Sequence, residues 1–146
     1  MSIAIQRASA PHEIERCLAI RRTVFIKEQG VDAALEVDGL DGEALHYLGR
    51  LGAVPVATAR VRLLREGDAR VAKVQRVAVL PEARGTGAGA AIMRHLMHDV
   101  ERTHGVASFT LGSQESAVPF YERLGYRIVG ERFMDAGIPH RTMVFP

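Results

Sequence analysis

Apolar positions in the first quarter of the chain change from strand-like to helical spacing. Ile3–Ile5 predicts a short strand. Ser9 then offers a helix N-cap, Pro11 suits the first helical turn, and apolar or long side chains recur at helical spacing. This stripe consists of Ile14, Cys17, Leu18, Arg21, Val24 and Phe25. The glycine-rich, acidic stretch 28–44 that follows predicts a long surface loop with room for a helical turn.

The rest of the chain alternates strands and helices. Strand-like runs with short turns between them predict antiparallel hairpins over 45–51, 54–64 and 70–80. Apolar residues three and four apart predict a helix from Gly87 to about Arg102, ended by Gly105. A strand at 107–112, a short helix at 117–125 and strands at 126–133 and 142–145 complete the chain. The order β α β β β α β α β β predicts an α/β (α+β) fold with a mixed sheet and helices on its faces.

Composition places the chain in a broad class. With 146 residues it fits a single domain, 1–146. The one cysteine, Cys17, excludes an internal disulfide and fits a reducing compartment. We see no signal peptide and no apolar run long enough to span a membrane, so we expect a cytoplasmic protein. A net charge of +2 from scattered basic residues does not predict a nucleic-acid partner.

The stretch VAVLPEARGTGAG, residues 77–89, places glycines between a predicted strand and a predicted helix. A P-loop would need Lys followed by Ser or Thr after its last glycine, where this chain has Ala90 and Ala91. A dinucleotide fingerprint fits the glycine spacing, but residues 106–112 contain no acid to hold a ribose. A third mechanism is general, because the free N–H groups of a helix start bind anions and glycine lets a phosphate approach.

These residues carry a resemblance to a known family. Arg84–Gly89 matches the R/Q-x-x-G-x-G/A signature of the GNAT superfamily of acyl-CoA-dependent N-acyltransferases. The run 120–126, FYERLGY, resembles the second GNAT signature. The stretches VFIKEQG, EALHYLG and AGIPHRTM look like the ElaA and YjcF branch of the superfamily. The resemblance covers essentially the whole chain and implies a strongly twisted sheet of about six or seven strands, in which strands 4 and 5 splay apart to admit the pantetheine arm of CoA.

The same resemblance implies how acetyl-CoA is bound. The backbone amides from Arg84 to Gly89 would hold the CoA pyrophosphate, and Val77 and Val79 would pair with the pantetheine amides. The implied cofactor-binding set is Val77, Ala78, Val79, Arg84, Gly85, Thr86, Gly87, Ala88 and Gly89. In the alternative interpretation the glycines only make a turn, although a plain turn does not need three of them in alternate positions.

Attack of an amine on a thioester needs a neutral amine and a proton for the departing thiolate. Tyr121 lies where GNAT enzymes commonly place the proton donor; the alternative is a tyrosine that anchors a short helix. His140, which we expect in a loop after Pro139, resembles the Pro-His element that supplies the base in glyphosate acetyltransferases. The alternative is an ordinary surface histidine. His46 competes for the role of base, as a structural or substrate-contacting residue near a strand start.

Other polar residues are candidates for substrate binding. Arg76 and Gln114 adjoin the two strands that the resemblance implies to be splayed, so both could project into the cleft. Many GNAT members have asparagine where this chain has Gln114, which puts the usual cofactor contact in doubt and makes a substrate role comparable. Glu28 and Gln29 could line the acceptor side or end a helix as solvated groups. No cluster of residues has the spacing of metal ligands, so we expect no metal.

The leading hypothesis is an N-acetyltransferase that uses acetyl-CoA and a small-molecule primary amine. Because Cys17 lies on the apolar stripe, direct transfer in a ternary complex is favoured over an acyl-cysteine route. Two alternatives remain open: a non-catalytic acyl-CoA-binding regulatory module, and an acetyltransferase that acts on a protein or peptide amine. Small GNAT proteins often pair, so we also predict a homodimer.

Overall fold

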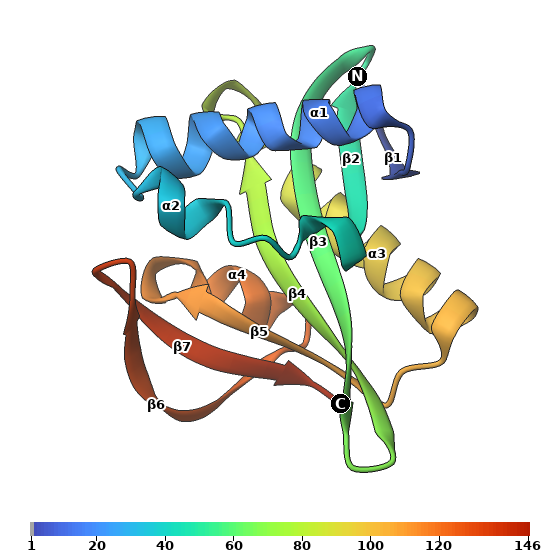
Figure 1. Ribbon diagram of the computed structural model, residues 1–146, viewed down its shortest axis with the longest axis vertical. Coiled ribbons are helices and arrows are strands. Elements are labelled where there is room, and N and C mark those ends of the chain that lie inside the picture. Colours follow the sequence, from blue (N-terminus) through green and yellow to red (C-terminus); the bar gives the residue numbers. More distant parts are fainter. Residues whose placement is uncertain (1) are drawn as a thin grey trace.

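The computed structural model of the chain describes residues 2–146 and forms one seven-stranded sheet with helices on both faces (Figure 1). The strand order is β1-β2-β3-β4-β5-β7-β6. The strands are β1 (Ile3–Ala8), β2 (Leu45–Leu51), β3 (Val54–Glu66), β4 (Ala69–Val79), β5 (Ser108–Gln114), β6 (Arg127–Asp135) and β7 (Ile138–Phe145). The helices are α1 (Pro11–Arg21), α2 (Ala33–Glu36), α3 (Ala88–His104) and α4 (Val118–Arg123). Shorter helical segments are the π-helical η1 (Arg22–Glu28) and the 3-10 segments η2 (Asp41–Glu43), η3 (Pro81–Ala83) and η4 (Glu115–Ala117).

The predicted order of helices and strands is confirmed, as is the mixed sheet. All neighbouring strands are antiparallel except β4 and β5, which run parallel. The predicted N-cap of α1 is wrong by one residue, because Ala10 rather than Ser9 holds that position. The carboxylate of Glu13 compensates by accepting hydrogen bonds from the N–H groups of Ser9 and Ala10 at 3.3 and 3.1 Å.

Helix α3 packs on one face of the sheet through the apolar stripe that its sequence predicts. Ile92, Met93, Leu96 and Val100 are fully buried, while the intervening polar positions face outward. Gly105 ends the helix in the left-handed conformation, with φ of 61°, and donates its N–H to the Glu101 carbonyl. The first turn of α3 lies next to the end of β4, since a Cβ on Gly89 would be 3.6 Å from the Val79 side chain. The glycine-rich loop connects these two elements.

Helix α1 covers the opposite face and runs across the front of the sheet in Figure 1, while α3 lies behind it. Cys17, Ile20 and Val24 form a second apolar cluster with Leu48 of β2 and Ala78 of β4. The chain continues from α1 into η1 without leaving helical geometry, and a π-helical turn of this kind often marks a functional site. The end of η1 is therefore positioned beside the last residues of β4.

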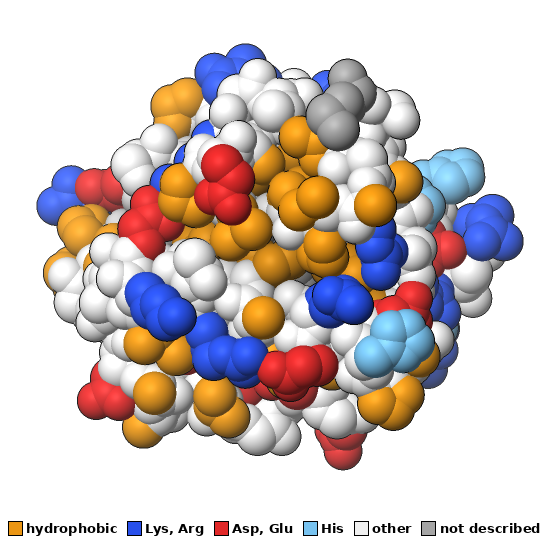
Figure 2. All heavy atoms as spheres, turned by 90° about the horizontal axis from the view of Figure 1, so that it is seen from above, with side chains coloured by type: hydrophobic (Ala, Val, Ile, Leu, Met, Phe, Trp, Pro, Cys, Tyr) orange, Lys and Arg blue, Asp and Glu red, His pale blue; other side chains and the backbone are white. Residues whose placement is uncertain are grey.

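Charged side chains of both signs are interspersed with apolar ones on the face that Figure 2 shows. No broad field of one charge covers this face, in keeping with the small net charge of +2. Within residues 2–146, no helix has both the length and the apolar character needed to cross a membrane.

Candidate active site

A cleft opens where β4 and β5 separate. The two strands pair only from Val71 to Val74 on β4, opposite Ser108 to Leu111 on β5. Beyond these pairs both strands continue, β4 to Val79 and β5 to Gln114, without bonding to each other. The cavity between them has a volume of about 770 Å³ and is lined by residues from η1, α2, both strands, α4 and the β6–β7 hairpin. The expected splay between strands 4 and 5 is thus present.

A bulge in β4 sets the direction of its last residues. Thr58 pairs with Ala78 and Arg60 with Gln75, so two residues of β4 lie opposite one of β3. Arg76, one of the two, has a φ of 56°, a left-handed conformation that is uncommon for a residue with a side chain and often found at functional sites.

The bulge also decides which backbone groups face the cleft. Leu80 donates its N–H to Val56 of β3, and groups on alternate residues point to opposite sides of a strand. The amide groups of Ala78 therefore face β3, and those of Val77 and Val79 face the cleft. Val77 and the N–H of Val79 present an open strand edge there, whereas the Val79 carbonyl accepts from Arg84 Nε. Ala78 packs its side chain under α1.

The loop after β4 leaves several N–H groups free. Arg84 and Thr86 donate their N–H groups to the carbonyls of Pro81 and Ala83, and the first bond of α3 runs from Ala91 to Gly87. Among the described residues, no partner accepts from the N–H groups of Gly85 and Gly87, and the first turn of α3 has none by its geometry. These residues form an amide-rich concavity suited to an anion.

Gly85 and Gly87 are required by backbone geometry and leave open space. Their φ angles are 81° and 88°, in the region that favours glycine. A Cβ built on either residue would meet no atom within 4 Å. A side chain at these positions would therefore stand in the open concavity itself, and not in the protein interior.

Arg84 is held by an ion pair rather than left free beside this concavity. Its guanidinium makes two 2.6 Å hydrogen bonds to the carboxylate of Glu28 and donates from Nε to the Val79 carbonyl at 3.1 Å. This pairing lowers the pKa of Glu28. Glu28 thus neutralises the charge of Arg84, which lines the cleft, whereas Glu28, a candidate for the acceptor side, does not line it.

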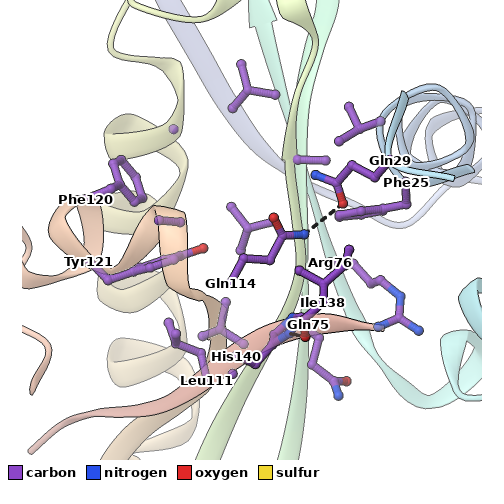
Figure 3. A pocket seen from close by; sticks show the side chains of 18 of the residues that line it. Phe25, Gln29, Gln75, Arg76, Leu111, Gln114, Phe120, Tyr121, Ile138 and His140 are labelled. Carbon is purple, nitrogen blue, oxygen red and sulfur yellow. Dashed lines mark hydrogen bonds between the residues drawn. The ribbon is translucent and has the colours of Figure 1, made fainter. Parts of the chain in front are cut away.

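Tyr121 lies on α4 with its hydroxyl directed toward the middle of the cleft and the side chain of Gln114 (Figure 3). Its ring packs edge to face against Phe120 and Tyr126, with centroids 4.9 and 5.9 Å away. Burial raises the pKa of the Tyr121 hydroxyl, which keeps it protonated at neutral pH. Within residues 2–146 no hydrogen-bond partner is present for this hydroxyl, so a group bound in the cleft can receive its proton.

His140 belongs to a strand, and the expectation of a loop position is wrong. The β6–β7 turn lies earlier, at Ala136 and Gly137, and His140 pairs in register with Gln114 on β5. The side chain is buried, and its Nδ1 lies 2.7 Å from the Ile138 carbonyl. Because a carbonyl only accepts, Nδ1 carries the proton in this contact, and Nε2 of the neutral ring is left as an acceptor.

Gln114 lies between Tyr121 and the end of η1 (Figure 3). Its Nε2 donates to Oε1 of Gln29 at 2.8 Å, a bond that spans the cleft from β5 to η1. This contact engages the NH₂ group of the Gln114 amide with the protein. The amide oxygen of Gln114 is left to accept a hydrogen bond from a bound molecule.

The side chain of Arg76 points away from Tyr121 and Gln114 in Figure 3, although the residue lines the cleft. Its Nε donates to Glu36 at 3.0 Å, and Glu36 also receives two hydrogen bonds from Arg21 at 2.9 and 2.7 Å. Arg76 therefore adjoins the cleft as expected, but its guanidinium is held by carboxylates of the loop, and a contact with substrate stays a prediction.

A partly buried charge cluster anchors the loop that precedes β2. It consists of Arg21, Glu36, Asp38, Asp41, Arg60 and Arg76. Sequence reasoning missed it, although the acidic residues in 28–44 and the arginine in the apolar stripe of α1 were visible signals. The cluster ties α2 to β3 and β4 and so fixes one wall of the cleft.

His46 lies outside the cleft. It is buried at the start of β2, with Nε2 2.9 Å from the carbonyl of Asp41, so the turn at η2 covers it. It is not among the cleft-lining residues, and its predicted contact with substrate has no support in the structure. Nowhere in residues 2–146 do three or more His, Cys, Asp or Glu side chains form a group able to hold a metal ion.

Comparison with known proteins agrees with this geometry. Residues 12–145 match the family model of the acetyltransferase (GNAT) domain. YjcF of Bacillus subtilis, named as an N-acetyltransferase, is 37% identical over 138 residues, which cover 94% of this chain and 95% of that protein. The crystal structure of Escherichia coli ElaA superposes with a TM-score of 0.86 at 26% identity, covering 99% of this chain and all of that one.

A more distant structure shows the same fold with a ligand. The aminoglycoside 6'-N-acetyltransferase complexed with coenzyme A has a TM-score of 0.73 at 16% identity, over 99% of this chain and 96% of that one. The resemblance to the ElaA and YjcF branch, predicted from the sequence motifs, is confirmed by the relatives above. The chain belongs to the GNAT acetyltransferase family and is an acyltransferase.

Proposed function

We propose that this protein transfers the acetyl group of acetyl-CoA to the primary amine of a small molecule, by direct attack in a ternary complex. Acetyl-CoA supplies a thioester whose leaving group is a thiolate. One observation carries the proposal: between the separated ends of β4 and β5, a hydroxyl donor on Tyr121 lies in the same cleft as the acceptor groups of Gln114 and His140. The amide-rich loop closes the cofactor end of that cleft.

The residues present fit acetyl-CoA at the cofactor end. The amide groups of Val77 and the N–H of Val79 form an open strand edge, which would pair with the amides of an extended arm as another strand would. The free N–H groups at Gly85, Gly87 and Ala88 suit a pyrophosphate, and the absent side chains at the glycines give it room. These observations support residues 77–79 and 84–89 as the cofactor site.

Tyr121 is the proposed proton donor. Its raised pKa keeps the hydroxyl protonated, and a thiolate that forms in the cleft is a stronger base than a neutral thioester sulfur. The proton passes from Tyr121 Oη to the departing sulfur. Tyr121 also lines the cleft, so its hydroxyl can reach a sulfur bound there.

His140 and Gln114 are the proposed partners of the amine. His140 Nε2 accepts the proton that the amine loses, directly or through a water. The Gln114 amide oxygen accepts a hydrogen bond from the amine and orients its lone pair. The register pairing of Gln114 with His140 places the two residues side by side on β5 and β7.

Direct transfer is supported by the position of the one cysteine. Cys17 is fully buried on the inner face of α1, with Sγ 3.6 Å from the Tyr47 carbonyl, and it does not line the cleft. Burial raises the pKa of its thiol, which disfavours the thiolate needed for attack. An acyl-cysteine route would therefore need a nucleophile that the cleft does not contain.

The test is a screen of amines, amino sugars, amino acids and peptides, in which release of free thiol from acetyl-CoA is followed. We expect at least one small amine to be acetylated and Tyr121→Phe to lower turnover about 10²-fold, with acetyl-CoA affinity unchanged. Tyr126→Phe is the matched control, because Tyr126 is also buried but donates to the Met97 sulfur outside the cleft. Thiol release that depends only on peptides, or that survives Tyr121→Phe, would contradict the proposal.

Two further expectations remain predictions. A homodimer is predicted, and light scattering at micromolar concentration would contradict it by giving a 16.0 kDa particle. Cytoplasmic location is predicted from composition, and fractionation of cells that express the tagged protein tests it.

A further inference from the structure

The end of the cleft away from residues 84–89 has walls that are mostly apolar. One wall comes from η1 and α2 with the loop between them, and the other comes from the β6–β7 hairpin. The apolar side chains on these walls are Phe25, Val31 and Leu35 on the first, and Phe133, Ala136 and Ile138 on the second. Two segments far apart in the sequence thus place apolar side chains around the same cavity.

Several of these side chains are left open to solvent. Leu35 is 57% exposed and Phe133 38% exposed, although both line the cavity. Phe133 packs beside His140, with ring centroids 5.5 Å apart, so this apolar wall adjoins the polar groups of the cleft. Exposed apolar side chains that gather around a cavity mark a binding site for a ligand with an apolar part.

The charged groups at this end do not select a charged ligand. Glu36 is neutralised by Arg21 and Arg76, which hold it through short hydrogen bonds. Lys73 and Asp135 also line the cavity, and their opposite signs give no preference for an anion or a cation. The feature that distinguishes this end of the cleft is therefore its apolar surface.

We propose that the acceptor is a primary amine that carries an apolar alkyl or aryl substituent, packed between Leu35 and Phe133. The inference rests on the proposed acetyl transfer and specifies its substrate class. The amine group would lie at Gln114 and His140, and its substituent would extend between the apolar walls. We assign the apolar surface to the acceptor because the proposed amine partners, Gln114 and His140, line the same cavity and Phe133 packs beside His140.

The test measures kcat/KM for linear alkylamines from ethylamine to hexylamine with acetyl-CoA. These amines differ little in basicity, so the neutral fraction is constant and chain length is the variable. Each methylene buried between the walls should raise kcat/KM about fourfold. Leu35→Ser should flatten this dependence. Val54→Ser is the matched control, because Val54 is 58% exposed but lies at the β2–β3 turn and does not line the cleft.

Three results would overturn the inference. The first is thiol release that does not depend on amine chain length in the wild type. The second is a rate that rises with the acyl chain of the CoA thioester at a fixed amine, which would assign the apolar walls to the acyl group. The third is an equal effect of Leu35→Ser and Val54→Ser. Absence of thiol release with every amine would overturn the proposed function as well, so the two failures are distinguishable.

Discussion

Replacement of Gly87 by alanine isolates the role of the loop that precedes α3. Gly87 has a φ of 88°, and a Cβ there would meet no atom within 4 Å. The methyl group therefore causes no clash in the free protein and adds only the strain of a left-handed alanine, about 1 kcal/mol. It would nevertheless stand in the concavity where the proposed pyrophosphate lies.

The effect on binding is larger than the effect on folding. Hydrogen bonds to a charged group contribute about 1.5 to 3 kcal/mol each, so displacement of one phosphate oxygen from its amide corresponds to roughly a ten- to hundredfold loss of affinity. Gly67 offers a matched control at the β3–β4 turn. Its φ is 63°, a Cβ there also meets nothing within 4 Å, and it does not line the cleft.

Two measurements separate the effects. Urea denaturation should show that Gly87→Ala and Gly67→Ala lower the free energy of unfolding by similar amounts. Isothermal titration calorimetry should show weaker acetyl-CoA binding only in Gly87→Ala. Wild-type affinity in Gly87→Ala, or equal weakening in Gly67→Ala, would refute the assignment of this loop to the pyrophosphate.

Three further changes test other parts of the site. His140→Gln should lower kcat/KM about 10²-fold, with partial rescue at higher pH because more amine is then neutral; a wild-type pH profile would remove His140 as the base. Gln29→Met removes the acceptor for the Gln114 amide, which is then free to rotate, and should raise KM for the amine about fivefold. Gln29→Glu keeps an acceptor oxygen and should leave this KM unchanged. The hydrogen bond from Arg60 lowers the pKa of Asp38, so this pair stabilises the folded protein above about pH 4, and the stabilisation is lost as the pH falls further. Urea denaturation should therefore show that the free energy of unfolding falls less at acid pH in Asp38→Asn than in the wild type.

Much of the fold follows from local patterns in the sequence. Helix α3 was predicted because its buried residues recur every three or four positions and Gly105 ends it, and both are properties of neighbouring residues. The glycine-rich loop 84–89 is predicted from its own short sequence pattern as well, and the structure gives Gly85 and Gly87 left-handed conformations there.

The parts that the sequence did not reveal depend on contacts between distant segments. Arg84 is neutralised by Glu28, which is 56 positions away in the chain. Arg76 turns from the cleft because a bulge in β4 sets its direction and Glu36 receives its guanidinium. His140 was placed in a loop because Pro139 suggested a turn, whereas the turn is formed earlier and β7 begins at Ile138. Contacts between distant segments, and not local propensity, therefore decide the positions of these side chains.

The most direct test of the account follows both products of the reaction at once. Purified protein is incubated with acetyl-CoA and an amine identified in the screen, and free thiol and N-acetylated amine are quantified by absorbance and mass spectrometry. We expect one acetylated amine for each thiol released, with both lost together in Tyr121→Phe. Thiol released without acetylated amine would show hydrolysis of the thioester and would contradict transfer to an amine.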